Sequence, residues 1–310
     1  MTRVTAPSRL HFGLLHVPTA ATPPAARRFG GIGLMIDQPG VVVSIQPADA
    51  WRFEGMLASR AQAFAHRFLA SLDRAVPPLH MLVERCPKEH AGLGVGTQLG
   101  LAVGKAIAVE SGLGELKATE IAVRVGRGER SAIGVHGFDR GGLVVEPGKR
   151  PGEALSPLLT CIRLPEEWRA AVFIPSGRGA WHGSREEGAF AAALSPSPTD
   201  ALCDLTIREL LPAAAAGDLP AFGDAVHRFN RLAGEPFAAA QGGAYSSPEI
   251  AELIGRIRGL GVAGTGQSSW GPAVFAVVES QDRASWLVKQ LAGTRGWIAR
   301  PSDGHKVERS

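Results

Sequence analysis

The chain has few cysteines and no long apolar run. Cys86, Cys161 and Cys203 are its three cysteines, and their wide spacing matches neither a disulfide framework nor a metal-binding motif. No apolar stretch approaches the roughly 20 residues that a membrane-spanning helix needs. The first residues, MTRVTAPSRLHFG, lack the apolar core of a secretory signal. We therefore expect a cytoplasmic protein with no membrane partner.

Concentrated positive charge is also missing. The net charge is +4, lysines and arginines form no block, and the chain has a single tyrosine. Proteins that bind nucleic acid carry a basic patch, with interleaved aromatic residues where they bind single strands. The composition therefore argues against a nucleic-acid partner. It favours small anionic ligands, which scattered arginines next to glycines can bind.

The hydrophobic pattern predicts two α+β domains that share a cleft. The Pro/Gly-rich segment at 147–157 is the best boundary, so we place the domains at residues 1–155 and 156–310. We expect the polar segment after Pro301 to be frayed. The expected strands cover 41–45, 79–84, 141–146, 170–175, 273–278 and 296–299, and the expected helices cover 60–75, 97–110, 118–128, 198–217, 219–233, 248–260 and 281–292.

Glycines stand at alternate positions in AGLGVGTQLG, residues 91–100, between a predicted strand and a predicted helix. Glycine adopts left-handed backbone angles and permits close approach, and the first N–H groups of a helix attract anions. The loop therefore suggests a phosphate cradle, although it matches no P-loop and a plain strand-to-helix turn stays an alternative. With neighbouring donors and cations, the candidate phosphate-binding residues are Gly92, Gly94, Gly96, Thr97, Gln98, Lys88 and Arg127.

We expect a second glycine-rich turn, GTGQSSWGP at 264–272, before the strand expected at 273–278. It could be a simple hairpin-like loop, but a turn has no need of a Gln-Ser-Ser-Trp run. Hydroxyl and amide groups between glycines suit a bound polar ligand. We take Gln267, Ser268, Ser269 and Trp270 as candidate substrate-binding residues.

The segment GRGERSAIGVHGFDRGG at 126–142 reads as one glycine-punctuated loop that interleaves charges with a short apolar stretch. This pattern is more typical of a pocket wall than of a solvated face. His136 could act as an acid, a base or a hydrogen-bond donor, whereas a lone histidine is more often structural. His136, Asp139 and Arg140 are the candidate catalytic residues.

Arginines and histidines near glycines also occur within residues 8–16, 27–37 and 174–187. They fit a ligand with several anionic groups, although any one arginine could instead form a surface salt bridge. The histidine spacing matches no familiar metal site, so the metal ligands stay unassigned. The further candidate substrate-binding residues are Arg9, His11, Gly30, Gly31 and Arg178.

Several of these segments together are similar to one known family. AGLGVGTQLGLAVGKAI, GRGERSAIGVHGFDRGG, QGGAYSSPE and GTGQSSWGP resemble the β-ribofuranosylaminobenzene 5′-phosphate synthase family, which has the GHMP kinase fold; SRLHFGLLH and FGGIGLMID fit the same family. The resemblance runs over nearly the whole chain. It implies an α+β, two-domain GHMP-kinase-like fold, with a ribosomal-protein-S5-domain-2-like N-terminal domain, a ferredoxin-like C-terminal domain and the site between them.

The resemblance also implies a reaction. Phosphoribosyl pyrophosphate and 4-aminobenzoate would combine to a C-riboside of methanopterin biosynthesis, with loss of pyrophosphate and CO2. Mg²⁺ would accompany the pyrophosphate, and a homodimer would be in keeping with the family. We expect little acid or base work, because positioning and charge stabilisation carry such a reaction. The helix start at 94–98 would hold the pyrophosphate, and Arg127, Arg140 or Arg178 would hold the 5′-phosphate or the carboxylate.

The chain departs from the kinases of this superfamily at two motifs. Where they resemble P-x-x-x-G-L-G-S-S-A, it has GLGVGT at 92–97 and lacks the serine pair. Where their second motif offers an aspartate after Ser-Gly-Ile, it has SAIGVH at 131–136, with the nearest aspartate at Asp139. Both changes weaken an ATP-dependent interpretation. A small-molecule kinase and a non-catalytic ligand-binding relative are the alternatives.

Overall fold

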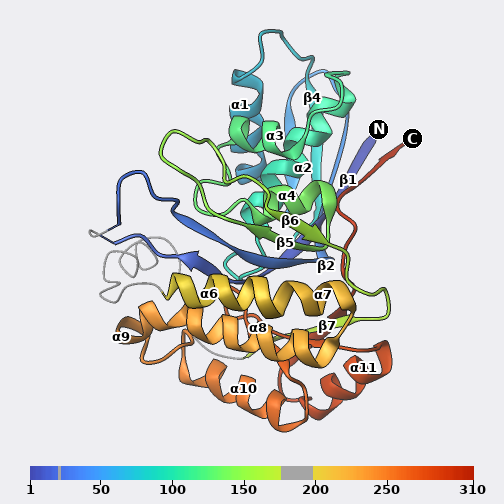
Figure 1. Ribbon diagram of the computed structural model, residues 1–310. Coiled ribbons are helices and arrows are strands. Elements are labelled where there is room, and N and C mark those ends of the chain that lie inside the picture. The colour runs from blue at the N-terminus through green and yellow to red at the C-terminus, as the bar shows by residue number, and fades with distance from the viewer. Residues whose placement is uncertain (20–21, 176–197) are drawn as a thin grey trace.

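The computed structural model describes residues 1–19, 22–175 and 198–310, whose strands form two sheets (Figure 1). The first sheet is built on two long strands, β1 (Thr2–His16) and β2 (Phe29–Pro47), which pair in antiparallel orientation. Its order is β11-β1-β2-β4-β3, and the first part of β2 also pairs with β5, which pairs with β6. The shorter strands are β3 (Arg52–Gly55), β4 (Leu79–Arg85), β5 (Leu143–Glu146), β6 (Thr160–Ile162) and β11 (Lys306–Arg309).

The helix α2 (Val95–Glu110) is the centre of the N-terminal core. Its sequence, VGTQLGLAVGKAIAVE, is apolar on nearly every face, and most of its residues are buried, as expected of a helix enclosed on all sides. Gly100 and Gly104 let its neighbours pack closely, because a Cβ on Gly100 would lie 3.3 Å from the Phe64 ring. The neighbouring helices are α1 (Ala58–Ala70), α3 (Ala118–Val125) and α4 (Ile133–Arg140).

The second sheet has the order β10-β7-β9-β8, that of an antiparallel ferredoxin-like domain. Helices α10 and α11 pack together on one face of this sheet, and α8 packs on the other. The strands are β7 (Arg169–Ile174), β8 (Gly264–Gln267), β9 (Val274–Val278) and β10 (Arg295–Ala299). The helices are α6 (Thr199–Leu205), a π-helical turn (Thr206–Leu210), α7 (Leu211–Ala216), α8 (Leu219–Gly234), a 3-10 turn (Glu235–Phe237), α9 (Ala238–Gln241), α10 (Pro248–Gly259) and α11 (Gln281–Gln290).

Helix α8 joins the two halves into one continuous core. Its apolar stripe includes Phe222 and Phe229, which are fully buried, and the helix contacts both β8 and β1. Phe12 on β1 stacks on Phe275 of β9 with ring centroids 4.9 Å apart. Figure 1 shows α6, α7 and α8 crossing the molecule between the region of α1–α4 and the region of α10 and α11. Together these contacts unite the two sheets and their helices in one α+β structure.

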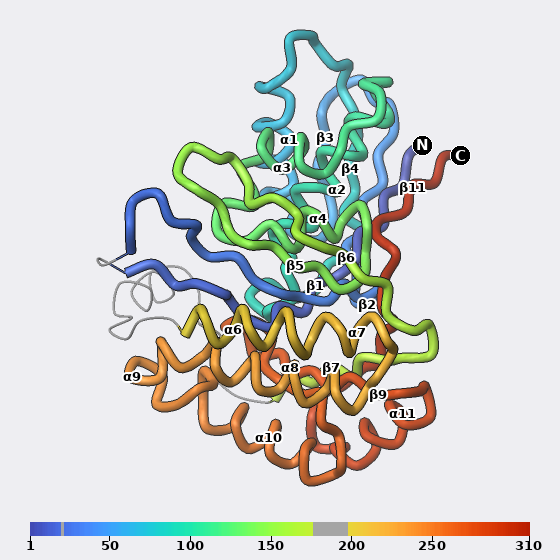
Figure 2. The backbone as a smooth tube through the Cα atoms, in the orientation of Figure 1, coloured from blue at the N-terminus to red at the C-terminus, as the bar shows by residue number. Residues whose placement is uncertain are grey.

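The chain crosses between the two regions after the boundary that we placed at residues 155 and 156. Strand β6 pairs with β5, and β11 pairs with β1, so both belong to the first sheet although they follow that boundary. The two ends of the chain lie side by side (Figure 2), and the Met1 amino group donates to the Ser310 carbonyl oxygen at 2.9 Å. Our expectation of a frayed tail is therefore wrong, because β1 pairs with that tail through its free edge.

Two other local expectations are also wrong. The segment 126–142 is not one loop, since Ile133–Arg140 forms α4, whose Gly137 packs against Met35 of β2. The segment 264–272 is not all turn, since its first four residues form β8. In both cases tertiary packing overrides the low helix and strand propensity of glycine. In the part of the chain that the structure describes, no helix is long and apolar enough to span a membrane.

Candidate active site

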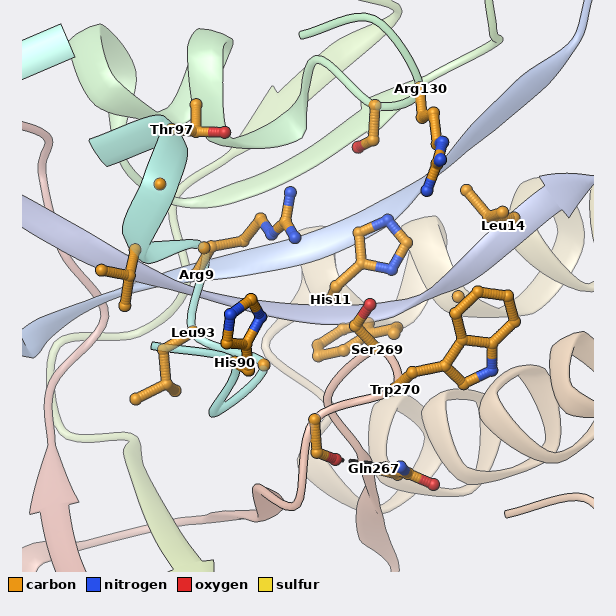
Figure 3. Close-up of a pocket in the computed structure, with 18 of the residues that line it drawn as sticks. Arg9, His11, Leu14, His90, Leu93, Thr97, Arg130, Gln267, Ser269 and Trp270 are labelled. Carbon is orange, nitrogen blue, oxygen red and sulfur yellow. Dashed lines mark hydrogen bonds between the residues drawn. The ribbon is translucent and has the colours of Figure 1, made fainter. Parts of the chain in front are cut away.

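A cleft of about 640 Å³ opens between the two sheets where β1, the glycine loop and the turn after β8 meet. The lining comes from segments far apart in the chain: β1, one face of α1, residues 89–97, residues 126–131, the end of α8, residues 237–245, and residues 267 and 269–271. Figure 3 shows side chains from these segments facing a common space. Ten residues predicted from the sequence line it: Arg9, His11, Gly92, Gly94, Gly96, Thr97, Arg127, Gln267, Ser269 and Trp270.

The glycine loop presents the start of α2 to the cleft. Gly94 caps this helix with a left-handed φ of 73°, and its carbonyl oxygen accepts the N–H groups of Thr97 and Gln98 at 3.1 Å. The N–H groups of Val95 and Gly96 lie in the first turn of α2, where the helix itself provides no carbonyl acceptor for them. A ligand can therefore accept these two N–H groups. A Cβ on Gly96 would lie 2.5 Å from the Arg60 Nη2 atom, so a larger residue would displace that guanidinium. This geometry suits a bound anion.

The first part of the glycine loop, at Gly92, is held by hydrogen bonding and close packing against the turn after β8. The fully buried Ser268 accepts the His11 N–H at its Oγ at 2.9 Å and donates from that Oγ to the Gly92 carbonyl oxygen at 2.7 Å. Gly271 packs directly on Gly92, where neither position has room for a Cβ. Ser268 therefore holds the loop rather than facing the ligand. The glycines at 92 and 271 allow two backbones to touch.

Positive charge dominates the cleft. Among the described residues, the lining includes Arg9, Arg60, Arg67, Arg127 and Arg130, against two carboxylates, Glu89 and Glu129. Arg60 pairs with Glu89. The Arg127 Nε is buried without a hydrogen-bond partner among the described residues, and burial, then the nearby Arg60, lowers the pKa of this guanidinium. A bound polyanion would relieve this mutual repulsion.

The opposite end of the cleft is apolar and aromatic. The Trp270 ring meets the Phe237 ring edge-on with centroids 4.6 Å apart, and Leu14 packs in the same small cluster. All three residues line the cleft. The cleft therefore joins an anion-binding end at α2 to an end that could hold a flat apolar ring.

His11 lies between these two ends. Its side chain is 5% exposed, and its Nε2 has no hydrogen-bond partner among the described residues. Burial, then the charge of Arg9, lowers the pKa of His11 well below its ordinary value. Figure 3 shows the side chains of Arg9 and Arg130 pointing toward the His11 ring. Burial and the charge of Arg9 therefore both favour the neutral form of this imidazole.

The three candidate catalytic residues, all on α4, do not reach the cleft. This helix turns its apolar residues inward, so that His136, Asp139 and Arg140 lie on its other side. The His136 Nε2 lies 2.9 Å from the Ser156 carbonyl oxygen, and Asp139 accepts the Ala118 N–H at the start of α3 at 2.8 Å. None of the three is part of the described lining. Their helical placement, which we did not expect, is the reason.

Other predicted residues are also set back from the cleft. Gln98 is fully buried, and its Nε2 donates to the carbonyl oxygen of Gly134 at 2.8 Å. Lys88 is exposed outside the described lining. Gly30 and Gly31 pack against neighbouring backbone in the sheet. Arg178 lies outside the residues that the structure describes.

Sequence reasoning missed two arginines of the cleft. Arg60 and Arg67 lie seven residues apart on α1 and therefore share one helix face. We had used this segment only for its apolar face. The sequence signal for them was the presence of two arginines two turns apart on one predicted helix, which faces the glycine loop in the structure.

A metal site is not formed by the described side chains alone, since they hold no cluster of three or more His, Cys, Asp or Glu residues. Mg²⁺ commonly takes one or two carboxylates and completes its shell with phosphate oxygens and water. Glu89 and Glu129 are the carboxylates of the described lining, so the cleft fits an ion that arrives with a polyphosphate.

The fold class is confirmed by comparison with known proteins. The family model "GHMP kinases C terminal" matches residues 210–293. A homoserine kinase from Cytophaga hutchinsonii aligns with a TM-score of 0.69 at 14% identity, covering 99% of this chain and 97% of that one. A 4-(cytidine 5′-diphospho)-2C-methyl-D-erythritol kinase aligns with a TM-score of 0.67 at 22% identity, covering 98% and 100%. The protein thus has the fold of the GHMP kinases.

Curated relatives define the family within that fold. The β-ribofuranosylphenol 5′-phosphate synthase of Methanothermobacter thermautotrophicus is 30% identical over 302 residues, covering 90% of this chain and 89% of the relative. The enzyme of the same name from Archaeoglobus fulgidus is 30% identical over 297 residues, covering 90% and 88%. The chain belongs to this β-ribofuranosylphenol 5′-phosphate synthase family, which confirms the resemblance drawn from its motifs.

Proposed function

We propose that the protein is a decarboxylating phosphoribosyltransferase. It would join phosphoribosyl pyrophosphate to a benzoate that carries a polar substituent opposite the carboxylate, forming a C-riboside and releasing pyrophosphate and CO2. The observation that carries this proposal is the pairing of an arginine-rich anion site at the start of α2 with an aromatic end in one cleft. The product class would feed methanopterin biosynthesis.

The anion-binding end would take the pyrophosphate. The N–H groups at the start of α2 and the guanidiniums of Arg60 and Arg127 converge at Gly96. As the bond to pyrophosphate breaks, negative charge grows on the leaving group, and fixed donors aimed at that charge lower the barrier. Mg²⁺, when bound, would neutralise part of the same charge. Glu129, or Glu89 beside Arg60, would hold the ion through its carboxylate.

The aromatic end would hold the acceptor ring. A flat ring can lie against Trp270 and Phe237, while a nearby arginine such as Arg130 pairs with the carboxylate. Placing the ring carbon that bears the carboxylate against the ribose carbon converts an encounter in solution into a positioned reaction. We infer that positioning and charge stabilisation supply most of the rate.

The acceptor itself has two candidates. Our sequence interpretation names 4-aminobenzoate, whereas the relatives carry the name of a phenol product, which corresponds to 4-hydroxybenzoate. The two acids differ only in the group opposite the carboxylate. Both acids are therefore assayed as acceptors.

The test uses purified protein, Mg²⁺, phosphoribosyl pyrophosphate and carboxyl-labelled acceptor, and counts released CO2. Release that needs both substrates is the expected result. If no CO2 is released while ADP forms from ATP with a small-molecule acceptor, the proposal fails and the kinase alternative replaces it. Binding of phosphoribosyl pyrophosphate without turnover of either benzoate would instead support a non-catalytic relative.

A further inference from the structure

The residues of β1 that line the cleft are graded along the strand from charged to apolar. Arg9 lies against Gly94 at the start of α2, where a Cβ on Gly94 would be 3.2 Å from the Arg9 Cβ. His11 comes two residues later, about 7 Å further along an extended strand, and Leu14 lies in the aromatic cluster. The pairing of β1 with β2 shifts register between His11 and Gly13, and such irregularities often redirect side chains near active sites.

The main chain of His11 is fixed on both sides. Its N–H donates to the Ser268 Oγ at 2.9 Å, and its carbonyl oxygen accepts the Ser269 N–H at 3.0 Å. The ring lies close to Gly31 of β2, where a Cβ would be 3.3 Å from the His11 Nε2 and 2.5 Å from the Gly13 carbonyl oxygen. The structure thus commits several elements to presenting one imidazole nitrogen.

Two other polar side chains of the lining, Asn230 and Gln267, are already used by the protein. Asn230 donates from its Nδ2 to the Phe12 and Gln267 carbonyl oxygens, and its Oδ1 accepts the Gln267 N–H. The Gln267 amide donates to the Ser246 Oγ and to the Gly271 carbonyl oxygen. The His11 Nε2 is buried without a partner among the described residues, and so are the Tyr245 Oη and the Gln241 Oε1 of the same lining. Of these three groups, only the imidazole nitrogen can take up a proton as a weak base.

We propose that His11 is a catalytic residue that accepts the proton from the hydroxyl group opposite the carboxylate when the acceptor is 4-hydroxybenzoate. This inference rests on the proposed function and deepens it, because it makes His11 a determinant of which benzoate is used. The groups that face the ring are Arg9 from β1 and Arg130 from the segment before α4, with neutral Gly31, Ser269 and Trp270 on the other sides.

The proton transfer follows from the charge that the reaction creates. The ring carbon bearing the carboxylate uses a ring electron pair to bond to the ribose carbon, while the bond to pyrophosphate breaks and its electron pair leaves with pyrophosphate. The ring is then a cation whose charge falls on the hydroxyl oxygen, which makes its proton strongly acidic. That proton passes to the His11 Nε2, and the oxygen keeps the O–H electron pair as a carbonyl.

Decarboxylation then closes the cycle. The bond between ring and carboxylate breaks, CO2 leaves, and the electron pair of that bond restores the aromatic ring and gives a phenolate oxygen. The phenolate takes back the proton from His11, so the imidazole is neutral again. A weak base suffices because the proton is acidic only in the intermediate, which agrees with an imidazole kept neutral by burial and by arginine.

The same residue matters less for an amino acceptor. Attack by 4-aminobenzoate leaves an iminium ion, which holds its charge on nitrogen and is a far weaker acid than a protonated ketone. Its proton can therefore stay in place until CO2 has left. Removal of the base should penalise the hydroxyl acceptor selectively, whereas loss of a merely structural histidine would lower both activities together.

The experiment compares His11→Gln with wild type on both acceptors. Glutamine keeps a polar group near the Nε2 position but cannot hold the proton. We expect kcat for 4-hydroxybenzoate to fall about 100-fold or more and kcat for 4-aminobenzoate to fall less than about 10-fold, with the KM for phosphoribosyl pyrophosphate little changed. His16→Gln, on the same strand but outside the cleft lining, is the matched control and should leave the ratio of the two rates unchanged.

The outcomes separate this inference from the proposed function. Equal losses on both acceptors, or a rise confined to the KM for phosphoribosyl pyrophosphate, would overturn the role of His11. A wild-type enzyme that releases CO2 only from 4-aminobenzoate would overturn it as well, while leaving the transferase function intact. If His11→Gln fails to fold, as judged by circular dichroism, His11→Asn provides the same comparison of acceptors.

Discussion

Replacing Ser268 by alanine should destabilise the contacts that the turn after β8 makes with the glycine loop and with β1. The Ser268 Oγ bonds to backbone groups of two other segments, β1 and the glycine loop. It accepts the His11 N–H at 2.9 Å and donates to the Gly92 carbonyl oxygen at 2.7 Å, in a position with no solvent exposure. Alanine is smaller and leaves both backbone groups buried without this partner.

The expected cost follows from those two groups. A buried donor or acceptor left unsatisfied costs about 1–3 kcal/mol, so two would cost roughly 2–6 kcal/mol. The carbonyl can use its second lone pair and the loop can relax, so we expect about 2–4 kcal/mol of lost unfolding free energy. The KM for phosphoribosyl pyrophosphate should rise too, because Gly92 begins the loop that presents the start of α2.

Urea unfolding followed by circular dichroism measures the first effect, and initial rates measure the second. Ser247→Ala is the matched control, because it removes one serine hydroxyl from the exposed start of α10, where the Oγ accepts the Ile250 N–H at 3.4 Å. That cap should be worth about 1 kcal/mol. A Ser268→Ala protein no less stable than Ser247→Ala would refute the reasoning.

Three further changes test other parts of the site. Gly96→Val should abolish turnover while the protein stays folded, because its side chain would displace the Arg60 guanidinium; near-normal kinetics would remove the cradle. Arg127→Gln should weaken pyrophosphate binding by about 10- to 100-fold in calorimetry and raise the Tm of the unliganded protein; an unchanged Kd would contradict this. Burial raises the pKa of Glu146, so the folded state prefers its protonated form and loses stability as pH rises from the unfolded pKa through the folded one. Urea unfolding at several pH values should therefore show Glu146→Gln gaining on wild type over that range, and a constant difference would exclude this linkage.

Much of the fold could be predicted because its signals are local. The apolar spacing of α1, α2, α8 and α10 and the β-branched run in β9 appear in short windows of sequence, and the corresponding elements formed. The glycine loop was also visible in the sequence, because its alternate glycines lie between a predicted strand and a predicted helix within one short window. Elements built against local propensity were missed. Helix α4 contains Gly134 and Gly137, and β8 contains Gly264 and Gly266, whose formation depends on partners far away in the chain.

The candidate site divides in the same way. Arg9, His11, Arg127 and Trp270 could be named because each lies beside a glycine-bearing segment, and the cleft includes them. His136 was named on the same ground and lies outside the lining, because the direction of a helical side chain depends on which face packs inward.

The sequence by itself therefore determined the periodic helices, the glycine-rich loop before α2, the absence of a conventional kinase motif and the family. The tertiary structure alone decided which charged groups share the cleft. Arg60 joins Gly96 from another helix, Ser268 joins Gly92 across 176 residues of chain, and β11 completes the edge of β1. The physical reason is that backbone periodicity is set by neighbours in sequence, whereas convergence of charge is set by how whole elements bury their apolar faces together.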